Sequence, residues 1–491
     1  MNSMKNLFIR SAAFCALALA LGLTSCDKQL NIDPLQSVDA ATALDSETKV
    51  ESAVVGLYAQ LGNSNLYGTN LILVPELLAA DNYIRFQGTF GNFRDIAVRN
   101  IRAENSTAET VWREAYQAIN QANLVLDALP VVTTAASKAR FEGEARFVRS
   151  TMYFELVRLY AKQYNAATAT TDLGVPINLL PVRTVEEASR RIARSTVAQV
   201  YALAIDDMTK AIALLPTANG NRATRFTAKA MLARVYLQQN RYAEAGVQAD
   251  EVIRTSGKTL AATIESVFRG RNGTETLLEI QQNDQNNAGT ANSGLATHYA
   301  SLGGVGRGDV LVLPAFTNLY GANDTRGAGT STPLLYNSTG ARRVTAPLVA
   351  LRTGKYTTFG QNIPVIRLAE MYLIRAEAAF RAGNVTAALS DLNVIRNRAG
   401  ATPLTLADLT PTNGVATILL ERQLELAFEG FRIHDLRRTN GIVAPARAAT
   451  PTTPAVPAVL ASDDRLVLPI PKRETDLNTA PNTPLAQNPG Y

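Results

Sequence analysis

Residues 376–395 read AEAAFRAGNVTAALSDLNVI, and this stretch decides which fold we expect. An alanine-rich run ends at Phe380, a tight turn at residues 382–384 follows, and a second apolar run carries Ala388. Apolar residues in both runs recur at spacings of three and four, which is the period of an amphipathic helix. Small residues where two helices cross let them approach closely, so the stretch predicts a helical hairpin of the tetratricopeptide type.

The same pattern occurs a second time, upstream. In residues 233–252, which read ARVYLQQNRYAEAGVQADEV, Leu237 ends the first run and Ala245 lies in the second. Helical periodicity also dominates the rest of the first half of the chain. It predicts helices over Ser46–Leu61, Thr107–Leu129, Lys138–Tyr164, Ser195–Leu215, Thr224–Gln239 and Tyr242–Thr255, with Ser195 as a helix cap. We therefore expect a mostly α fold of tetratricopeptide-like helical hairpins, with long irregular loops and a few short strands.

Two irregular regions interrupt the helices. Residues 260–364 are rich in Gly, Asn and Thr and contain one clear strand pattern, at Thr276–Ile280. Residues 62–99 form a second irregular block. Long loops inside a compact protein are usually functional or disordered, so both regions are candidates for a binding site. The expected organisation is a helical region over 26–259, a loop-rich insert over 260–364, and a second helical region over 365–491.

The N-terminus has the pattern of a bacterial lipoprotein signal. Lys5 and Arg10 flank the start of an apolar run over residues 11–23, which is too short to span a membrane. The run closes on Leu-Thr-Ser-Cys, where two small residues precede a cysteine that can be acylated before cleavage. We expect removal of residues 1–25, which leaves Cys26 as a lipid-carrying first residue. Two or three acyl chains are needed for anchoring, since each buried CH₂ contributes only about 0.8 kcal/mol. An ordinary signal peptide with a chance cysteine is the alternative.

The amino-acid composition argues against several classes of function. Removal of residues 1–25 leaves 466 of the 491 residues, with Cys26 as the only cysteine, so disulfides and thiolate metal clusters are not expected. Of the 48 Lys and Arg, 46 remain against 42 Asp and Glu, and they are scattered, which argues against nucleic-acid binding. His298 and His434 are the only histidines, and no serine has the context of a nucleophile elbow. The sequence thus predicts neither an enzyme nor a metal or cofactor site.

Motifs spread over almost the whole chain add a family resemblance. They are VWR at 111–113, INQAN at 119–123, YFEL at 153–156, RLAE at 367–370, ER at 421–422, EL at 425–426, EGFR at 429–432, DLRR at 435–438, PIP at 469–471 and QNPGY at 487–491. In this order they resemble the SusD/RagB family of nutrient-binding outer membrane lipoproteins. The charged series and the terminal QNPGY are the most specific part of the resemblance.

The charged motifs predict a structural network rather than a binding site. Glu421, Glu425 and Glu429 fall on neighbouring turns of one helix, where arginines can pair with them. The expected partners, which would lock the C-terminal segment onto the helices, are Arg422, Arg432, Arg437 and Arg438. Paired carboxylates also serve glycosidases, but acids on a charge-dense helix are more often salt-bridged.

The resemblance implies that exposed loops capture a ligand, with aromatic rings against sugar faces and amides or Arg on the hydroxyls. It also implies a surface-exposed, lipid-anchored protein that delivers an oligosaccharide or another nutrient to a SusC-like TonB-dependent transporter. The candidate ligand-binding residues are Tyr67, Tyr83, Arg85, Phe86, Phe90, Tyr299, Tyr320 and Asn323. We expect the segments 62–99 and 297–323 to meet in one shallow platform, because insertions from one stack of helices tend to emerge on the same face.

Several alternatives stay open at this point. Each loop aromatic can instead pack in the loop core. Trp112 lies in a helical motif, so no tryptophan is available as a sugar platform, which leaves a small oligosaccharide, a peptide or another nutrient as the ligand. A tetratricopeptide-type scaffold that offers a helical groove to a protein partner is the second candidate function. A glycoside hydrolase is the least favoured.

Overall fold

Polar side chains cap the starts of several main helices. The computed structural model describes residues 43–289, 292–327, 334–336, 351–449, 454–477 and 485–491. In it, Asn105, Thr196 and Thr224 accept N–H groups from the first turns of the helices that follow them. Such caps satisfy donors that have no partner inside the helix. The predicted cap at Ser195 is wrong by one residue, because Thr196 and Gln199 form a capping box.

The helices predicted for the first half of the chain are all present, and the prediction of a mostly α fold is confirmed. The longest helices among the described residues are α3 (Glu47–Leu61), α6 (Ser106–Asp127), α7 (Ala135–Tyr160), α9 (Val197–Leu214), α10 (Arg225–Gln238), α11 (Tyr242–Thr255), α15 (Leu368–Arg381), α16 (Val385–Arg398) and α17 (Gly414–Leu426). Residues 46–491 form one compact unit. Of residues 1–45 the structure describes only the turn at 43–45, so Cys26 lies outside the described residues.

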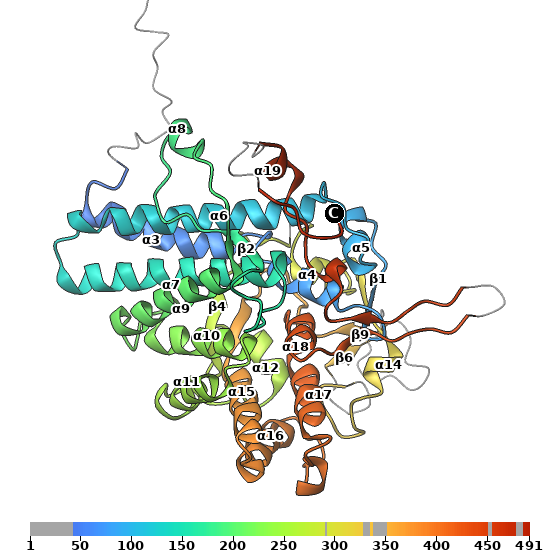
Figure 1. Cartoon of the computed structure of the whole chain (residues 1–491). Helices are drawn as coiled ribbons and strands as arrows, with labels where there is room; N and C mark the ends of the chain where they lie inside the picture. The colour runs from blue at the N-terminus through green and yellow to red at the C-terminus, as the bar shows by residue number, and fades with distance from the viewer. Residues whose placement is uncertain (1–42, 290–291, 328–333, 337–350, 450–453, 478–484) are drawn as a thin grey trace, which may run out of the picture. The chain divides into compact units, whose positions relative to one another are not determined.

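Consecutive helices pack side by side. α6 and α9 both pack against α7, and α10 packs against α9 and α11. The two predicted hairpins, α10–α11 and α15–α16, are present and adjacent, since α11 packs along α15 (Figure 1). Gly246 of α11 permits this contact, because a Cβ atom there would lie only 2.7 Å from the Cβ of Ala378. Two repeats that are far apart in sequence therefore form one continuous stack.

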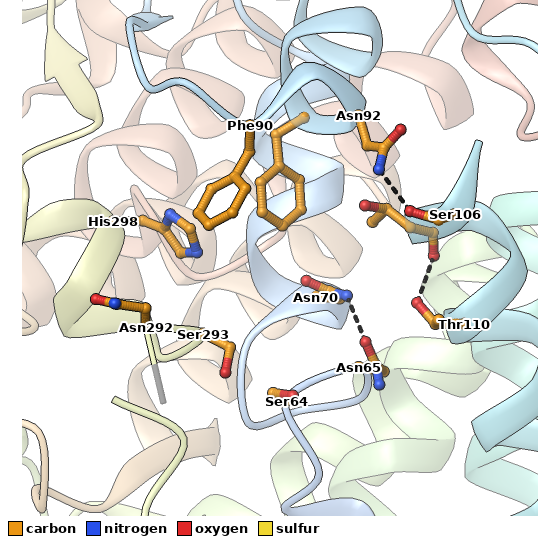
Figure 2. Close-up of a pocket in the computed structure, with 12 residues that line it drawn as sticks. Ser64, Asn65, Asn70, Phe90, Asn92, Ser106, Thr110, Asn292, Ser293 and His298 are labelled. Atoms are coloured by element: carbon orange, nitrogen blue, oxygen red, sulfur yellow. Dashed lines mark hydrogen bonds between the residues drawn. The ribbon is translucent and has the colours of Figure 1, made fainter. Parts of the chain in front are cut away.

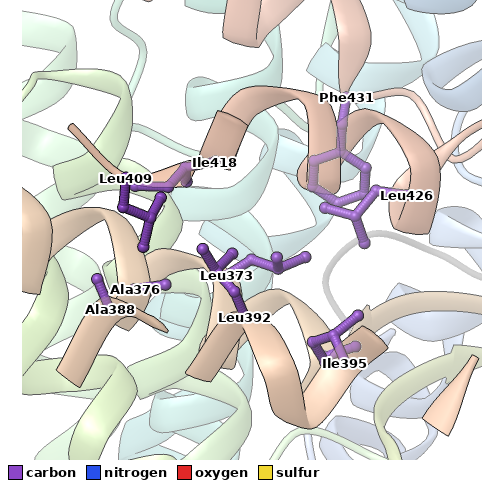
Figure 3. Close-up of a cluster of buried hydrophobic side chains, with 10 residues drawn as sticks. Leu373, Ala376, Ala388, Leu392, Ile395, Leu409, Ile418, Leu426 and Phe431 are labelled. Carbon is purple, nitrogen blue, oxygen red and sulfur yellow. The ribbon is translucent and has the colours of Figure 1, made fainter. Parts of the chain in front are cut away.

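An apolar cluster fills the space where α15, α16 and α17 meet (Figure 3). Its buried members are Ala369, Leu373, Ala376, Ala388, Leu392, Ile395, Leu409, Ile418, Leu426 and Phe431. The start of α17 requires a glycine, because a Cβ at Gly414 would lie 2.2 Å from the ring of Phe380. Burial of each large side chain contributes about 1.5–3 kcal/mol, so this cluster fixes α17 firmly on the helical stack.

The block at residues 62–99 is more regular than predicted. It contains α4 (Asn70–Leu78), β1 (Ile84–Phe86) and α5 (Gly91–Ala97). Every residue of α4 is buried, so the helix is apolar nearly all round and has no amphipathic pattern that a periodicity search can recognise. The prediction of an irregular block is therefore wrong here, and α4 forms part of the core.

The strands form five antiparallel pairs among the described residues. The predicted strand at Thr276–Ile280 is confirmed as β4, which pairs with β8 (Ile363–Arg367). The other pairs are β1 with β5 (Val310–Val312), β2 (Leu173–Pro176) with β3 (Arg194–Thr196), β6 (Leu335–Tyr336) with β7 (Arg352–Thr353), and β9 (Ile442–Ala444) with β10 (Val459–Leu460). Short helices connect these elements, and they are α8 (Val185–Ala188), α12 (Ile264–Arg269), α13 (Leu295–Tyr299), α14 (Pro314–Thr317), α18 (Arg432–Arg438) and α19 (Lys472–Leu477).

The acidic series Glu421, Glu425 and Glu429 forms a buried ion network, as the sequence predicts, but with other partners. The prediction that all three lie on one helix is wrong for Glu429, because α17 ends at Leu426 and the backbone leaves the helix at Ala427. The pairs are Glu421 with Arg326 and Arg396, Glu425 with Arg326, Arg367 and Arg398, and Glu429 with Arg367 and Lys355. These basic residues come from the loop before β6, the loop after β7, the end of β8 and the end of α16. The network therefore joins the loop-rich insert to the C-terminal helices.

The arginines that were expected to meet this acidic series act elsewhere. Arg422 pairs with Asp435 at 3.0 Å, and Arg438 pairs with Glu377 of α15 at 2.7 Å. Arg437 donates to two backbone carbonyls near the end of α7, those of Arg158 (2.6 Å) and Ala161 (2.8 Å). The α18 segment is thus locked onto the helical stack as predicted, through different contacts.

Glu76 of α4 gives the fold a pH-dependent contact. Its carboxylate is fully buried and accepts the N–H groups of Gly430 at 2.6 Å and Phe431 at 3.2 Å. Burial raises the pKa of Glu76 from its ordinary value of 4.5 to about 7.

We expect this shift to make the protein less stable as the pH rises from 4.5 to about 7. Over that range the unfolded chain loses the Glu76 proton while the folded chain keeps it, which costs up to roughly 1.4 kcal/mol per pH unit. Replacement of Glu76 with glutamine should remove this contribution. The measurement is the free energy of unfolding of both proteins across this range, and parallel pH profiles would contradict the assignment.

Candidate functional site

Pairing of β1 with β5 brings the two loop regions together. Ile84 lies opposite Val312 and Phe86 lies opposite Val310, and the N–H of Gln87 donates to the carbonyl of Asp309 at 2.8 Å. The segments 62–99 and 297–323 therefore meet in space, as the sequence predicts.

A pocket of about 340 Å³ opens beside this junction (Figure 2). It is lined by Ser64, Asn65, Asn70, Phe90, Asn92, Phe93, Ser106, Thr107, Thr110, Asn292, Ser293 and His298. These residues come from the loop before α4, the start of α5, the start of α6, and the segment around α13. No Asp, Glu, Lys or Arg is among the described residues of the lining. The pocket is therefore suited to a neutral ligand.

One side of the pocket is aromatic. The ring centroids of Phe90 and His298 lie 6.0 Å apart, those of Phe93 and His298 lie 5.1 Å apart, and all contacts among the three rings are edge-to-face. Phe90 is 40% exposed, and the guanidinium of Arg307 lies 4.5 Å from its ring centre. A half-exposed ring whose packing fixes its orientation is a suitable surface for the C–H face of a sugar.

The other side carries amides and hydroxyls. Asn92 donates to the hydroxyl of Ser106, and Asn70 donates to the side-chain oxygen of Asn65 at 3.2 Å (Figure 2). The backbone of Asn92 is also fixed, because Asn105, the cap of α6, donates to its carbonyl at 3.1 Å. Amides and hydroxyls both donate and accept, so this wall can bond the hydroxyl groups of a ligand.

A hydrogen bond to Asp309, which is itself ion-paired, holds His298 in place. Its Nδ1 lies 3.1 Å from the carboxylate of Asp309, which also pairs with Arg307 at 3.0 Å. A carboxylate can only accept, so Nδ1 of His298 carries the hydrogen of this bond. His298, Asp309, Arg307 and Phe90 therefore form one connected support for the aromatic side of the pocket.

Three of the candidate tyrosines lie in the core, which corrects the expectation of an exposed aromatic platform. Tyr67 is 3% exposed and donates its hydroxyl to Glu155 at 2.6 Å. Tyr83 is 4% exposed, and its hydroxyl accepts the N–H of Phe428 at 2.7 Å. Tyr299 is fully buried. In this structure these rings offer no face to a ligand, because the loops that carry them fold inward against α7 and the end of α17.

Of the remaining candidate residues, some lie at the pocket and others do not. Phe90 lines the pocket, and the buried Phe86 supports it from behind through an edge contact with Phe93 at 5.8 Å. Arg85 and Asn323 are exposed but do not line the pocket. Tyr320 is half-buried and donates its hydroxyl to the carbonyl of Leu424 at 3.0 Å. Trp112 packs in the core against Tyr160 at 5.1 Å, so it is no sugar platform.

Sequence reasoning missed the polar wall. The signal was present, because residues 62–70 and 283–293 are dense in Asn, Ser and Gly. Such runs also occur in ordinary turns, so composition alone did not separate them from turn residues.

Comparison with known proteins places the fold in a family. One family model, described as SusD family, matches residues 341–491, and another, described as starch-binding associating with outer membrane, matches residues 28–237. The two models match both ends of the chain, so the SusD family is the family that this chain resembles. The SusD-like protein P38 of Formosa agariphila is 24% identical, over 90% of this chain and 93% of its own.

Solved structures agree on the SusD fold. A SusD superfamily protein of Bacteroides thetaiotaomicron has a TM-score of 0.77 and 24% identity, with 90% of this chain and 100% of that chain covered. A laminarin-binding SusD-like protein has a TM-score of 0.71 and 22% identity, with 91% and 100% covered. The resemblance to the SusD/RagB family is thereby confirmed.

The family model of the first half carries an association with the outer membrane in its description. Within the described ranges, no helix of this chain combines the length and apolarity that crossing a bilayer requires.

Proposed function

We propose that this protein captures a neutral oligosaccharide in the pocket between Phe90 and Asn92. The observation that carries the proposal is the pairing of an aromatic wall with an uncharged wall of amides and hydroxyls. A sugar has both an apolar C–H face and directional hydroxyls, so it matches both walls at once. A few stacked rings contribute roughly 0.5–1.5 kcal/mol each, and ordering costs offset part of this gain, so we expect affinities between micromolar and millimolar.

The packing of the helices supports this role over that of a protein-interaction scaffold. α11 and α15 pack against each other through Gly246 and Ala378, so the adjoining faces of the two hairpins are filled by the chain itself. A catalytic role has less support, because Glu421 and Glu425, the carboxylates closest to a glycosidase pattern, are buried and paired with arginines.

Replacement of Phe90 with alanine should weaken oligosaccharide binding about tenfold, because loss of one stacking contact is worth about 1–1.5 kcal/mol. The melting temperature should stay almost unchanged, because Phe90 is exposed. The measurement is calorimetry with laminarin oligosaccharides first, since a structural neighbour is described as laminarin-binding, and then with other neutral glycans. Val98→Ala is the matched control, because Val98 follows α5, is 62% exposed and lies outside the pocket. Equal binding by both variants would contradict the proposal.

We further propose that acyl chains on Cys26 hold the protein on the outer membrane, where it delivers its ligand to a SusC-like TonB-dependent transporter. Replacement of Cys26 with alanine should leave a soluble or unprocessed protein, because the acylated cysteine supplies nearly all of the membrane affinity. The measurement is membrane fractionation in cells that lack the transporter. Partition of the variant into outer membranes would contradict the anchor, and co-purification of the wild-type chain with a barrel protein tests the partner.

A further inference from the structure

A second, larger cleft lies on a different part of the molecule. Its volume is about 690 Å³, and it shares no residue with the pocket of Phe90. It is formed by the loop that follows α7, the turn between α10 and α11, the end of α18, and the segment that follows β10. Its lining is Lys162, Gln163, Tyr164, Asn165, Ala166, Thr168, Asp172, Gln239, Asn240, Arg437, Arg438, Asn440, Ala461, Ser462, Asp463, Asp464 and Val467.

Hydrogen bonds to neighbouring elements hold the walls of this cleft in place. Gln163 and Gln238 are joined by two bonds, in which each side-chain amide donates to the other residue. Asn240 donates to the carbonyl of Arg438 at 3.1 Å. Arg437 is only 3% exposed, and both of its terminal nitrogens donate hydrogen bonds to backbone carbonyls near the end of α7. The cleft is therefore preformed, and a ligand does not have to order it.

The groups that remain for a ligand are one aromatic ring and several polar atoms. The half-buried ring of Tyr164 lies edge-to-face with Tyr201, at 5.2 Å between centroids. Asn440 and Ser462 present exposed side chains at the rim. Nε of Arg437 and Oε1 of Gln239 are buried without a hydrogen-bond partner among the described residues. One is a donor and the other an acceptor, and hydroxyl groups can bond either kind of atom.

The formal charges of the lining cancel, because Lys162, Arg437 and Arg438 stand against Asp172, Asp463 and Asp464. Lys162 lies 3.8 Å from Asp172, Arg438 is paired with Glu377, and Asp463 is paired with Arg465. The lining therefore has no net charge that would favour an anionic or a cationic ligand. The combination of an aromatic face, amides and hydroxyls in a concave site favours a neutral polyhydroxyl ligand.

We propose that this cleft is a second carbohydrate-binding site, which takes a neutral sugar against Tyr164, Asn440 and Ser462. It is built from residues of its own and does not depend on binding in the pocket of Phe90. A chain with two such sites can hold one long glycan, or two neighbouring glycan chains, more tightly than either site alone.

The test is hydrogen exchange of the full chain in detergent, with the methyl glycosides of glucose, galactose, mannose and xylose as probes. We expect at least one probe to slow exchange in residues 162–168 and 461–467. Asn440→Gly should abolish this protection, and so should Tyr164→Ala. The glycine variant leaves the backbone unstrained, because Asn440 has a φ of 52°, which glycine adopts freely. Phe90→Ala should leave this protection intact.

The two sites give separate footprints, so failure of one is distinguishable from failure of the other. Absence of protection in residues 162–168 and 461–467 with all four probes would overturn the second site. Protection that persists in both Asn440→Gly and Tyr164→Ala would overturn it as well.

Discussion

Replacement of Glu425 with glutamine should lower the free energy of unfolding by about 3–5 kcal/mol, because it leaves buried arginines without their counter-charge. Glu425 is fully buried and bonds Arg367 at 2.6 Å, Arg326 at 3.2 Å, and Arg398. Burial alone would raise the pKa of this carboxyl, but Arg398, Arg367 and Arg326 outweigh it and hold the pKa well below its ordinary value. Glutamine keeps the shape of the side chain and removes the charge, so the measured change isolates the electrostatic contribution.

Chemical denaturation of the wild type and the variant measures this loss. Glu186→Gln is the matched control, because Glu186 lies in the exposed turn of α8 and its substitution should change stability by no more than about 0.5 kcal/mol. A Glu425→Gln protein that is as stable as the control variant would mean that the network contributes nothing to the fold. A large loss would explain how an insert with few strands stays attached to the helical stack.

For this ion network, the structural role of the acids could be predicted from the sequence, but their partners could not. The spacing of Glu421, Glu425 and Glu429 predicts one charged helix face, which is correct only for Glu421 and Glu425, because α17 ends at Leu426. The preference of clustered acids for salt bridges predicts a structural role for all three, which is correct. The choice of partner is not encoded locally. Arg326 and Arg367 lie 95 and 58 positions from the acids that they bond, and only the folded chain brings them together.

The secondary structure was likewise predicted in part, since half-exposed helices were found and a fully buried one was not. The helices that are half exposed, such as α6 and α11, have the three-and-four spacing that predicts them. α4 is buried on all sides, so its sequence has no alternation of apolar and polar positions that would reveal a helix. It also lies in a block whose sequence looks irregular. The candidate site shows the limit most clearly, because the meeting of the two loop regions was predictable, whereas the burial of individual loop tyrosines was not.

Replacement of Tyr83 with alanine should destabilise the protein by about 3–5 kcal/mol, as expected for loss of a large core side chain. The ring packs edge-on against Phe316 at 4.6 Å and stacks with Phe428 at 5.4 Å. Its hydroxyl accepts the N–H of Phe428, whose φ of 68° is unfavourable for a residue with a side chain. Tyr83 therefore holds a strained turn in place and directly precedes β1, the strand that carries one side of the pocket junction.

Tyr83→Phe and Phe90→Ala separate the two roles that an aromatic residue of this region can have. Tyr83→Phe keeps the ring and loses the hydroxyl, which accepts from Phe428 and also bonds Glu76, so about 1–3 kcal/mol should be lost. Phe90→Ala should weaken binding and spare stability, whereas Tyr83→Ala should lose stability first and binding only as a consequence. Denaturation curves and oligosaccharide titrations of the three variants test this order. A stable Tyr83→Ala protein that no longer binds would show that Tyr83 contacts the ligand directly, in a conformation in which the loop opens.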